Sequence, residues 1–280
     1  QVEEFLKNTP EGIRKVEEAA REAQRRHARA STPRVARDDA REGAVSAATH
    51  VVVGCDGFGE ELKHAVVQHL KDKGVVVQDL GCDSFYEAAA SVAKHVQVGP
   101  GRSTGMLFCG TGMGVSIVAN KFEGVYAALA ENEAAARNSR AINNANVLCL
   151  GGKVTSEADA ARIADAFLGQ GFVTQPDTFM AEFWSPQVEE FLKNTPEGIR
   201  KVEEAAREAQ RRHARASTPR VARDDAREGA VSAATHVVVG CDGFGEELKH
   251  AVVQHLKDKG VVVQDLGCDS FYEAAASVAK

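Results

Sequence analysis

The chain has 280 residues, of which 44% are hydrophobic, and it has a formal net charge of −6 at pH 7. This hydrophobic content is sufficient for a globular core. The acidic balance argues against nucleic acid or an anionic membrane as a main partner, because contacts to phosphates require an excess of positive charge. No run of about 18 apolar residues and no signal-peptide pattern occurs, so we expect neither membrane insertion nor export.

The six cysteines form no C-x-x-C pair, so the sequence predicts neither a zinc site nor a thioredoxin-like centre. We therefore expect reduced thiols, no metal and no cofactor. A cytoplasmic location fits this composition, and a plastid location stays open because a transit segment would lie outside this sequence.

An internal repeat organises the whole sequence, since residues Gln1–Lys94 recur letter for letter as Gln187–Lys280. The offset from Gln1 to Gln187 gives a tandem repeat with a period of 186 residues. We interpret it as a natural polyprotein, an engineered fusion or a window on a longer array. We expect residues 236–280, the N-terminal half of the next repeat, to pack against matching segments of another chain or to be followed by the rest of that repeat.

The first expected element is a helix over residues 1–30, which we assign to the end of a preceding repeat. Thr9 followed by Pro10 is a helix-start signal, and apolar residues follow at helical spacing. Residues 31–49 are polar, with few large apolar side chains, and predict a linker. In the second copy the same patterns predict a helix over 187–216 and a linker over 217–235.

Residues 50–186 are expected to form one α/β domain. Short apolar runs rich in Val and Leu, typical of strands buried on both faces, predict strands at 50–55, 75–81, 105–110, 125–130 and 146–152. The segments 60–74 and 156–169 have helical periodicity and end at glycine. Right-handed crossovers between such units predict a doubly wound, Rossmann-like, five-stranded parallel sheet.

Open α/β sheets bind ligands beyond the carboxyl ends of their strands, which selects the loops at 55–59, 109–114 and 151–153. The turn Cys109-Gly-Thr-Gly-Met-Gly leads into a helix and presents several backbone N–H groups, a geometry suited to an anion. Cys109, at a strand end, can exchange a proton with a substrate carbon. The alternative is an inert buried cysteine, which we expect for Cys149.

Several motifs in collinear order resemble the ribose-5-phosphate isomerase type B family, to which galactose-6-phosphate isomerase is related. The resemblance covers residues 50–171 and rests on GCDGFGEELKHAVVQHLKDKGVVVQDLG, GMLFCGTGMGVSIVANKFEGVYAAL and NSRAINNANVLCLGGKV. Within the family, Asp56-Gly57 stands where other members have Asp-His, which is similar to the isomerase-like domain of plant DNA-damage-repair/toleration proteins. The implied fold is the parallel α/β sheet predicted above.

The resemblance implies an aldose–ketose isomerase for phosphorylated sugars, of the ribose 5-phosphate/ribulose 5-phosphate type, acting through an enediolate without a metal. Cys109 matches the family's base, and Thr111 would help to open the ring or relay a proton. Backbone N–H groups of Gly110, Gly112 and Gly114 would stabilise the enediolate oxygen. The other substrate-binding positions that it implies are Asp56, Gly57, Tyr86 or its neighbour Phe85, Met113, Asn143 and Lys153.

The resemblance also implies a homodimer or higher homo-oligomer whose active sites take residues from both subunits. Three departures from the family favour an alternative hypothesis, a catalytically inactive isomerase-like module with a structural or scaffold role. Ile142 stands where active members have a ring-opening histidine, Gly57 replaces another histidine, and the tail 169–184 contains no arginine for a phosphate. A redox or ligand sensor acting through Cys109 is a third hypothesis.

Overall fold

The computed structural model describes residues 50–98, 103–216, 236–241 and 245–268. The predicted helix 1–30 and the predicted linkers 31–49 and 217–235 lie outside the described residues. The chain separates into two compact units, residues 1–192 and 193–280, each with its own internal packing. The domain limits predicted from the sequence stay predictions.

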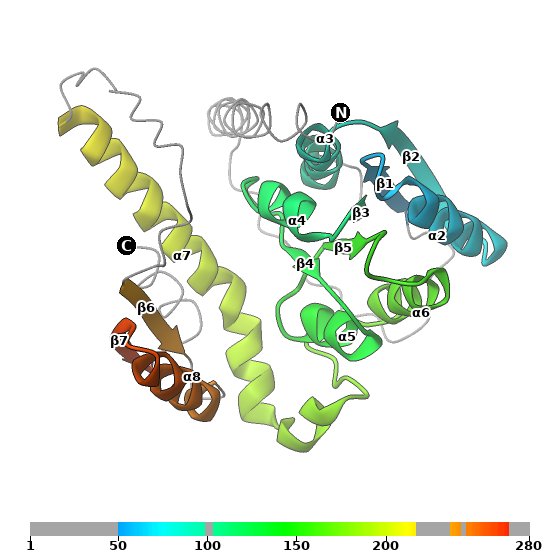
Figure 1. Cartoon of the computed structure of the whole chain (residues 1–280). Coiled ribbons are helices and arrows are strands. Elements are labelled where there is room, and N and C mark those ends of the chain that lie inside the picture. The colour runs from blue at the N-terminus through cyan, green and yellow to red at the C-terminus, as the bar shows by residue number, and fades with distance from the viewer. Residues whose placement is uncertain (1–49, 99–102, 217–235, 242–244, 269–280) are drawn as a thin grey trace. The chain divides into compact units, whose positions relative to one another are not determined.

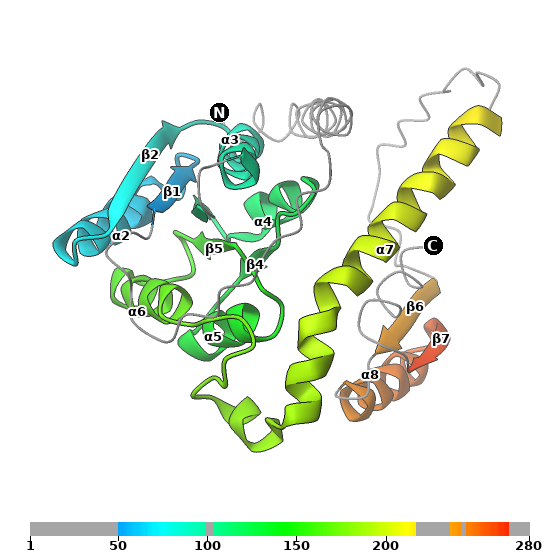
Figure 2. The same ribbon diagram turned by 180° about the vertical axis from the view of Figure 1, so that it is seen from behind.

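The first unit contains a five-stranded parallel sheet with the order β2-β1-β3-β5-β4 (Figure 1; Figure 2). Its strands are β1 (His50–Cys55), β2 (Val76–Cys82), β3 (Thr104–Cys109), β4 (Ala127–Leu129) and β5 (Val147–Gly151). From β1 the chain moves outward to β2 and then returns to the other side of β1 as β3, so the strand order reverses between β1 and β3. The predicted α/β fold with a five-stranded parallel sheet is confirmed.

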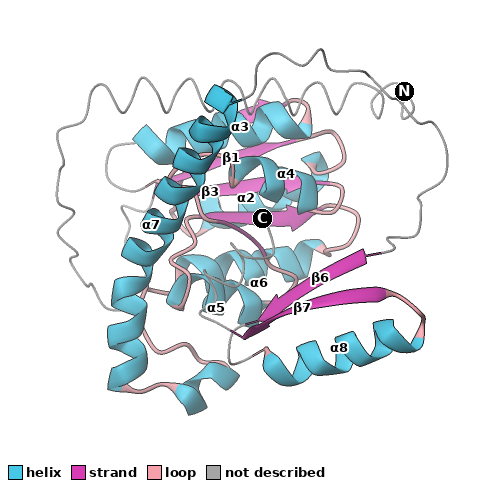
Figure 3. Ribbon diagram, turned by 90° about the vertical axis from the view of Figure 1, so that its left-hand side faces the viewer, coloured by secondary structure: helices cyan, strands magenta, loops and turns pink. Residues whose placement is uncertain are grey.

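Helices cover both faces of this sheet, because alternate residues of each central strand point to opposite sides. Val51 and Val53 belong to one apolar cluster and Val52 to the other. Figure 3 shows the strands lying among the helices that cover them. The first cluster contains residues of α2 (Glu60–Asp72), α5 (Glu133–Ala141) and α6 (Glu157–Leu168), and the second contains residues of α3 (Phe85–Val98) and α4 (Met113–Ala119). A short helix η1 (Phe179–Phe183) follows α6.

The strands differ in burial according to their place in the sheet. Every residue of β5 is buried, and β1 and β3 are buried except for their first residues. The expectation that every strand is buried on both faces is wrong for β2, whose Val76 is 54% exposed, and for β4, whose residues are half-buried. Both strands lie at an edge of the sheet, where each has one neighbouring strand instead of two.

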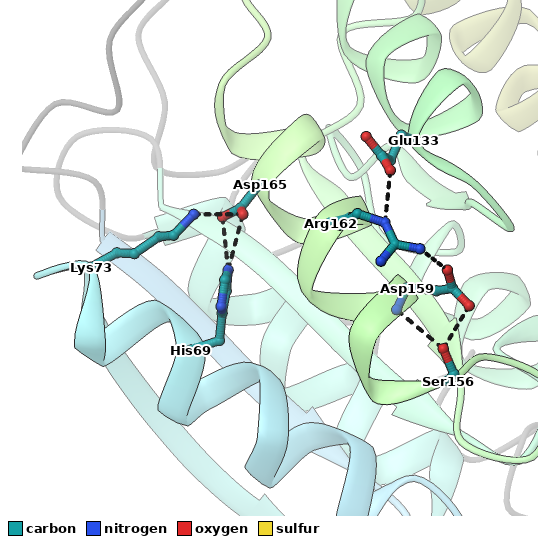
Figure 4. Close-up of polar contacts among 7 residues, drawn as sticks. All are labelled: His69, Lys73, Glu133, Ser156, Asp159, Arg162 and Asp165. Carbon is teal, nitrogen blue, oxygen red and sulfur yellow. Dashed lines mark hydrogen bonds and ion pairs between the residues drawn. The ribbon is translucent and has the colours of Figure 1, made fainter.

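Charged side chains connect the helices of one face at their surfaces (Figure 4). His69 Nε2 lies 3.0 Å from both carboxylate oxygens of Asp165, and Lys73 Nζ lies 2.6 Å from Asp165 Oδ2, which joins α2 to α6. Arg162 of α6 binds Glu133 of α5 at 3.0 Å. Such exposed pairs stabilise a fold by about 0–1 kcal/mol each, so they add little to the apolar packing of α6 in the first cluster.

The helix in the second copy begins earlier than its start signal suggested. α7 spans Pro186–Ala216, so the helix predicted over residues 187–216 is present, but it continues through Pro196, the copy of Pro10. The interpretation of Thr-Pro as a helix start is therefore wrong in this copy. Leu192 and Thr195 are buried, at 2% and 3% exposure.

The second unit contains β6 (His236–Cys241), α8 (Glu246–Asp258) and β7 (Val262–Cys268). Its two strands are parallel and keep the register of the first copy, since His236 pairs with Val262 as His50 pairs with Val76. The same sequence therefore forms the same β-α-β segment in both units.

A buried lysine joins α2 to β2. The Lys63 side chain is 2% exposed, and its Nζ donates to Asp79 Oδ1 at 2.9 Å and to the Gly81 carbonyl at 3.2 Å. Burial by itself lowers the pKa of Lys63, but the hydrogen bond to Asp79, together with electrostatic interactions with Cys55 and Asp79, outweighs it and raises that pKa above its ordinary 10.5. Lys249 and Asp265 repeat the contact at 2.9 Å. The ion pair is therefore a property of the β-α-β segment itself.

We expect Asp79→Ala to lower the free energy of unfolding of the first unit by about 2 kcal/mol, less than the ~3–5 kcal/mol of a fully buried pair because Asp79 is 35% exposed. The raised folded-state pKa of Lys63 means that the pair's stabilisation is complete below pH 10.5 and is lost as the pH rises through the folded-state value. Urea denaturation followed by fluorescence of Trp184, the chain's single tryptophan, measures both effects. If a Lys63→Met chain lost as much stability at high pH as the unaltered chain does, the loss could not be due to deprotonation of Lys63, and this account would be contradicted.

Candidate functional site

Loops after β1, β3 and β5 meet at the carboxyl end of the sheet, next to the point where the strand order reverses. The N–H of Asp56 donates to the Phe108 carbonyl at 3.0 Å, and the N–H of Gly152 donates to the Cys109 carbonyl at 2.7 Å. The N–H of Lys153 donates to the Gly110 carbonyl at 2.9 Å. The structure thus brings together the three loops selected from the sequence, at the position where open α/β sheets bind ligands.

Glycine is required where these loops touch. A Cβ on Gly59 would lie 2.4 Å from the carbonyl carbon of Phe108, and a Cβ on Gly152 would lie 2.4 Å from the carbonyl oxygen of Phe58. Neither position accepts a side chain without moving the backbone. The motifs predicted these loops, but the need for glycine at these two positions was not predicted from them. The available signal was the glycine in each loop, in DGFG and in GGK.

The turn after β3 places the sulfur of Cys109 next to a backbone amide. Cys109 is 5% exposed, and its Sγ accepts the N–H of Gly112 at 3.1 Å. Gly112 has a φ of +78°, in the left-handed region that favours glycine, and a Cβ there would lie 2.6 Å from Leu129 Cδ1. The structure therefore differs from the expectation that the Gly112 N–H faces a substrate oxygen, because this N–H is bound to the sulfur.

Other amides of the same turn are available to a ligand. Among the residues that the structure describes, none accepts a hydrogen bond from the N–H of Gly110, Thr111 or Gly114. The Thr111 side chain is exposed, and its Oγ1 accepts the N–H of Met113 at 3.4 Å. Successive backbone N–H groups in a turn form a concave site that favours an anion. The turn can therefore stabilise negative charge through Gly110, Thr111 and Gly114.

A buried carboxylate lies at the end of β1. Asp56 is 5% exposed, and its Oδ1 accepts the N–H of Phe58 at 2.9 Å and that of Gly59 at 3.1 Å. Burial raises the pKa of Asp56, and the two hydrogen bonds only partly oppose this shift. The neighbouring Gly57 is exposed, with open space where a Cβ would point. The loop thus holds Asp56 in a fixed orientation beside a position that has room for a side chain.

Aromatic side chains at the start of α3 border the turn. The rings of Phe85 and Tyr86 meet edge to face, with centroids 5.2 Å apart. Phe85 lies against Gly114, where a Cβ would be 3.0 Å from Phe85 Cδ2. Tyr86 is half-buried, whereas Met113 and Lys153 are exposed. Of the two aromatic candidates, Phe85 touches the turn directly and Tyr86 lies beside it.

Asn143 lies away from these loops. It is exposed and follows α5, in the connection that enters β5 at the amino end of the sheet. In that connection the Asn146 carbonyl accepts the N–H of Gly105, near the start of β3. Ile142, the residue at the C-cap of α5, precedes Asn143 in the same connection. One copy of the domain therefore does not bring Asn143 together with Asp56 and Cys109.

The other chemical groups considered from the sequence have simpler placements. Cys149 is fully buried, and burial raises its pKa, in agreement with an inert thiol. Within the described ranges, no group of three or more His, Cys, Asp and Glu side chains is arranged to hold a metal ion. None of the helices described has both the length and the apolar character needed to cross a membrane.

Comparison with known proteins gives a consistent family. The family model described as Ribose/Galactose Isomerase matches residues 51–178. The 4-deoxy-4-sulfo-D-erythrose isomerase of Clostridium sp. (strain MSTE9) is 40% identical over 161 residues, which cover 55% of this chain and 96% of that protein. Ribose-5-phosphate isomerase B of Escherichia coli is 41% identical over 123 residues, covering 42% of this chain and 83% of that protein.

A longer relative and a solved structure are also similar to part of this chain. The DNA damage-repair/toleration protein DRT102 of Arabidopsis thaliana is 40% identical over 157 residues, which cover 55% of this chain. The match spans about half of that protein, 51% of its length. The crystal structure of ribose-5-phosphate isomerase B from Mycoplasma genitalium with bound ribulose-5-phosphate is 31% identical, covering 54% of this chain and 98% of that chain, with a TM-score of 0.44.

We expect Asp56→Asn to raise the free energy of unfolding near neutral pH, because the amide keeps an acceptor oxygen and removes a buried charge. Because the folded-state pKa of Asp56 is raised, protonation of its carboxyl group stabilises the folded state. This stabilisation is complete below the ordinary pKa of 3.8 and is lost as the pH rises through the folded-state pKa. The advantage of the asparagine chain should therefore be absent below pH 3.8 and grow above it. Thermal unfolding across this range measures the difference, and a less stable Asp56→Asn chain at neutral pH would refute the prediction.

Proposed function

The chain belongs to the ribose/galactose isomerase family, and we propose that its residues 50–186 interconvert the aldose and ketose forms of a small phosphorylated sugar of the ribose 5-phosphate type. The observation that carries this proposal is the sulfur of Cys109 at the end of β3, bound by the Gly112 amide and next to a turn with further N–H groups. A base and an oxyanion site in one turn are what proton transfer next to a carbonyl requires.

Cys109 is the base in this proposal. As a thiolate it takes the proton from C2 of the open-chain aldose, and the electron pair of that C–H bond forms the enediolate. The same sulfur then returns a proton to C1, which gives the ketose. The N–H of Gly112, 3.1 Å from Sγ, supports this role because a hydrogen bond to a charged acceptor is stronger than one to a neutral acceptor.

The enediolate oxygen is stabilised by the amides of Gly110 and Gly114 in this proposal. Their N–H groups are fixed by the fold before the substrate arrives, so no reorganisation is needed as charge develops. Thr111, exposed on the same turn, relays the hydroxyl proton. In this proposal the N–H of Gly112 binds the sulfur of the base, and the N–H groups of Gly110 and Gly114 bind the substrate.

In this proposal a negatively charged residue binds the hydroxyl groups of the sugar, and a positively charged residue binds its terminal anion. Asp56 accepts hydrogen bonds from the sugar hydroxyls, and the exposed Lys153 attracts the terminal anion. The relatives include one isomerase named for a phosphosugar and one named for a sulfosugar, and each of these sugars has a terminal anion. Gly57 and Tyr86 border the sugar beside Asp56, and Met113 borders it from the turn.

A second copy of the domain completes the site in this proposal. Asn143 lies at the amino end of its own sheet, so it reaches a substrate only if another copy presents it. Large apolar side chains are exposed on the site loops and on α4, namely Phe58, Met113, Ile117 and Val154, at 46%, 54%, 58% and 66%. Adjacent exposed apolar side chains on a soluble protein favour an interface. We assign them to a homodimer contact.

We expect Cys109→Ser to reduce kcat for ribose 5-phosphate by about 10²–10⁴-fold, the usual contribution of a positioned base. Cys82→Ser is the matched control, because Cys82 is exposed at the end of the edge strand β2 and should leave the rate unchanged. Turnover by the purified chain is measured on pentose and hexose phosphates and on a four-carbon sulfosugar. Absence of turnover on all of them would reject the isomerase and favour the inactive module that Ile142 suggests.

The dimer is tested at α4. We expect Ile117→Glu to convert dimers to monomers in sedimentation velocity, because a carboxylate in a closed apolar contact is left without its hydration. Val76→Glu is the control, since Val76 is as exposed, at 54%, but lies on β2 away from the site loops. Equal sedimentation of the two variants would exclude this face as the contact.

A further inference from the structure

Two cysteines lie opposite each other on neighbouring strands. Cys55 is the last residue of β1 and Cys82 is the last residue of β2, and the two residues are direct partners in the parallel ladder. Neighbouring strands lie about 4.7–4.9 Å apart, and disulfides join residues whose Cα atoms are about 4.4–6.8 Å apart. The backbone therefore already holds these two residues at a separation that a disulfide can span.

A bulge in β2 brings the two side chains to the same face of the sheet. Val53 pairs with Asp79, and Cys55 pairs with Cys82, so three steps along β2 match two steps along β1. Side chains alternate between the two faces of a sheet, so without the extra residue Cys82 would point away from Cys55. Gly81, with a φ of +93°, adopts the left-handed conformation at this bulge.

The buried ion pair of α2 and β2 stabilises this bulge. Asp79 Oδ1 accepts the Lys63 ammonium at 2.9 Å and the N–H of Gly81 at 2.8 Å, and the Gly81 carbonyl accepts the same ammonium at 3.2 Å. The second copy repeats the register shift, the positive φ and these hydrogen bonds, and there Cys241 pairs with Cys268. The approach of two cysteines is thus built into the β-α-β sequence itself.

The two thiols of the first unit interact in their reduced form. Cys55 is fully buried, and its Sγ donates to the Gly81 carbonyl at 3.7 Å. Burial and a hydrogen bond with the Cys82 thiol raise the pKa of Cys55 to about 12, against the opposing effect of the Lys63 charge. Cys82 is exposed. The pair therefore combines a thiol that a reagent in solution can reach with a protected thiol beside it.

The other two cysteines of the sheet provide a contrast. Cys109 and Cys149 also lie on neighbouring strands, but Cys109 pairs with Gly151 and Cys149 pairs with Leu107. They are therefore two residues out of register, which places their Cα atoms about 8 Å apart. This separation exceeds the roughly 7 Å beyond which a disulfide requires backbone movement. Among the cysteines of β1 to β5, the two at the ends of β1 and β2 are the pair in register.

We propose that Cys55 and Cys82 form a modification site at which a low-molecular-weight disulfide reversibly converts the two thiols into a disulfide. The thiolate of Cys82 attacks one sulfur of the reagent, which forms a mixed disulfide and releases the first reagent thiolate. Cys55, after losing its proton, attacks the Sγ of Cys82, and the second reagent thiolate leaves. The two protons lost by the cysteines are taken up by the two released thiolates, so two cysteines are oxidised and one reagent disulfide is reduced.

Exposure determines the order of the two steps. Cys82 meets the reagent first, because Cys55 is shielded from solvent. Cys55 reacts second, as a thiolate whose formation the nearby positive charge of Lys63 favours. The product closes a covalent loop over residues 55–82, within one β-α-β segment. Such a loop restricts the unfolded chain, so the disulfide should stabilise the first unit.

The experiment uses the full chain with Cys241→Ser and Cys268→Ser, so that the identical cysteines of the second copy do not react in parallel. The reduced protein is incubated with glutathione disulfide near neutral pH, quenched with acid, and analysed by intact mass and peptide mapping. We expect a product lighter than the reduced chain by two hydrogens, in which the peptides of Cys55 and Cys82 are joined. Excess dithiothreitol should restore the starting mass.

Two single replacements in this background separate the steps. A Cys55→Ala chain should stop at the mixed disulfide on Cys82, because the second thiol is missing. A Cys82→Ser chain should form no adduct at Cys55, because the remaining thiol is buried. A mixed disulfide that persists on Cys82 while Cys55 is present would overturn the proposal. So would a product in which Cys82 is joined to Cys109 or Cys149 instead.

Unfolding in urea, followed by fluorescence of Trp184, gives a second measurement on the same samples. We expect the midpoint to be higher for the cross-linked chain than for the reduced chain, and the glutathionylated Cys55→Ala chain to show no such increase over its own reduced form. A cross-linked chain that unfolds at lower urea would overturn the proposal, because the disulfide would then strain the register that should hold it. Neither measurement depends on isomerase activity, so the two proposals can fail separately.

Discussion

The candidate site depends on how closely three backbone segments approach one another at the carboxyl end of the sheet. At Gly59 and Gly152 a single added carbon would overlap the neighbouring backbone. This close packing determines where the turn after β3 can run, and the positive φ of Gly112 then directs its N–H to the sulfur of Cys109. The side chains that carry the proposed chemistry are therefore positioned by contacts between loops, and the sheet supplies the rigid base for those loops.

Sequence patterns predicted the sheet well because β1, β3 and β5 are buried on both faces and consist of continuous apolar runs. They overestimated the burial of β2, since an apolar run does not encode whether its strand lies at an edge. The direction of the Gly112 amide depends on one dihedral angle, and the distance of Asn143 from the turn depends on topology. A sequence motif contains neither the dihedral angle nor the topology, although the glycine-rich motifs did identify the loops.

The two copies of the β-α-β segment separate local from tertiary effects. Strand register and the Lys63–Asp79 contact recur at Lys249–Asp265 without change, so they follow from the segment's own sequence. The exposure of Leu62 does not recur at Leu248, so burial of this leucine follows from neighbouring elements. The local sequence thus determines the secondary structure of this segment, whereas the elements that pack against the segment determine which of its side chains are buried.

The open space at Gly57 determines where the site loops accept a substitution. At Gly59, Gly112 and Gly152 a Cβ would lie less than 3.0 Å from a neighbouring atom, so a substitution there requires the surrounding structure to move. Gly57 differs because a Cβ there would meet no atom within 4 Å, although the residue follows the buried Asp56 directly. A substitution at this position can therefore add a side chain beside the candidate site without a steric clash.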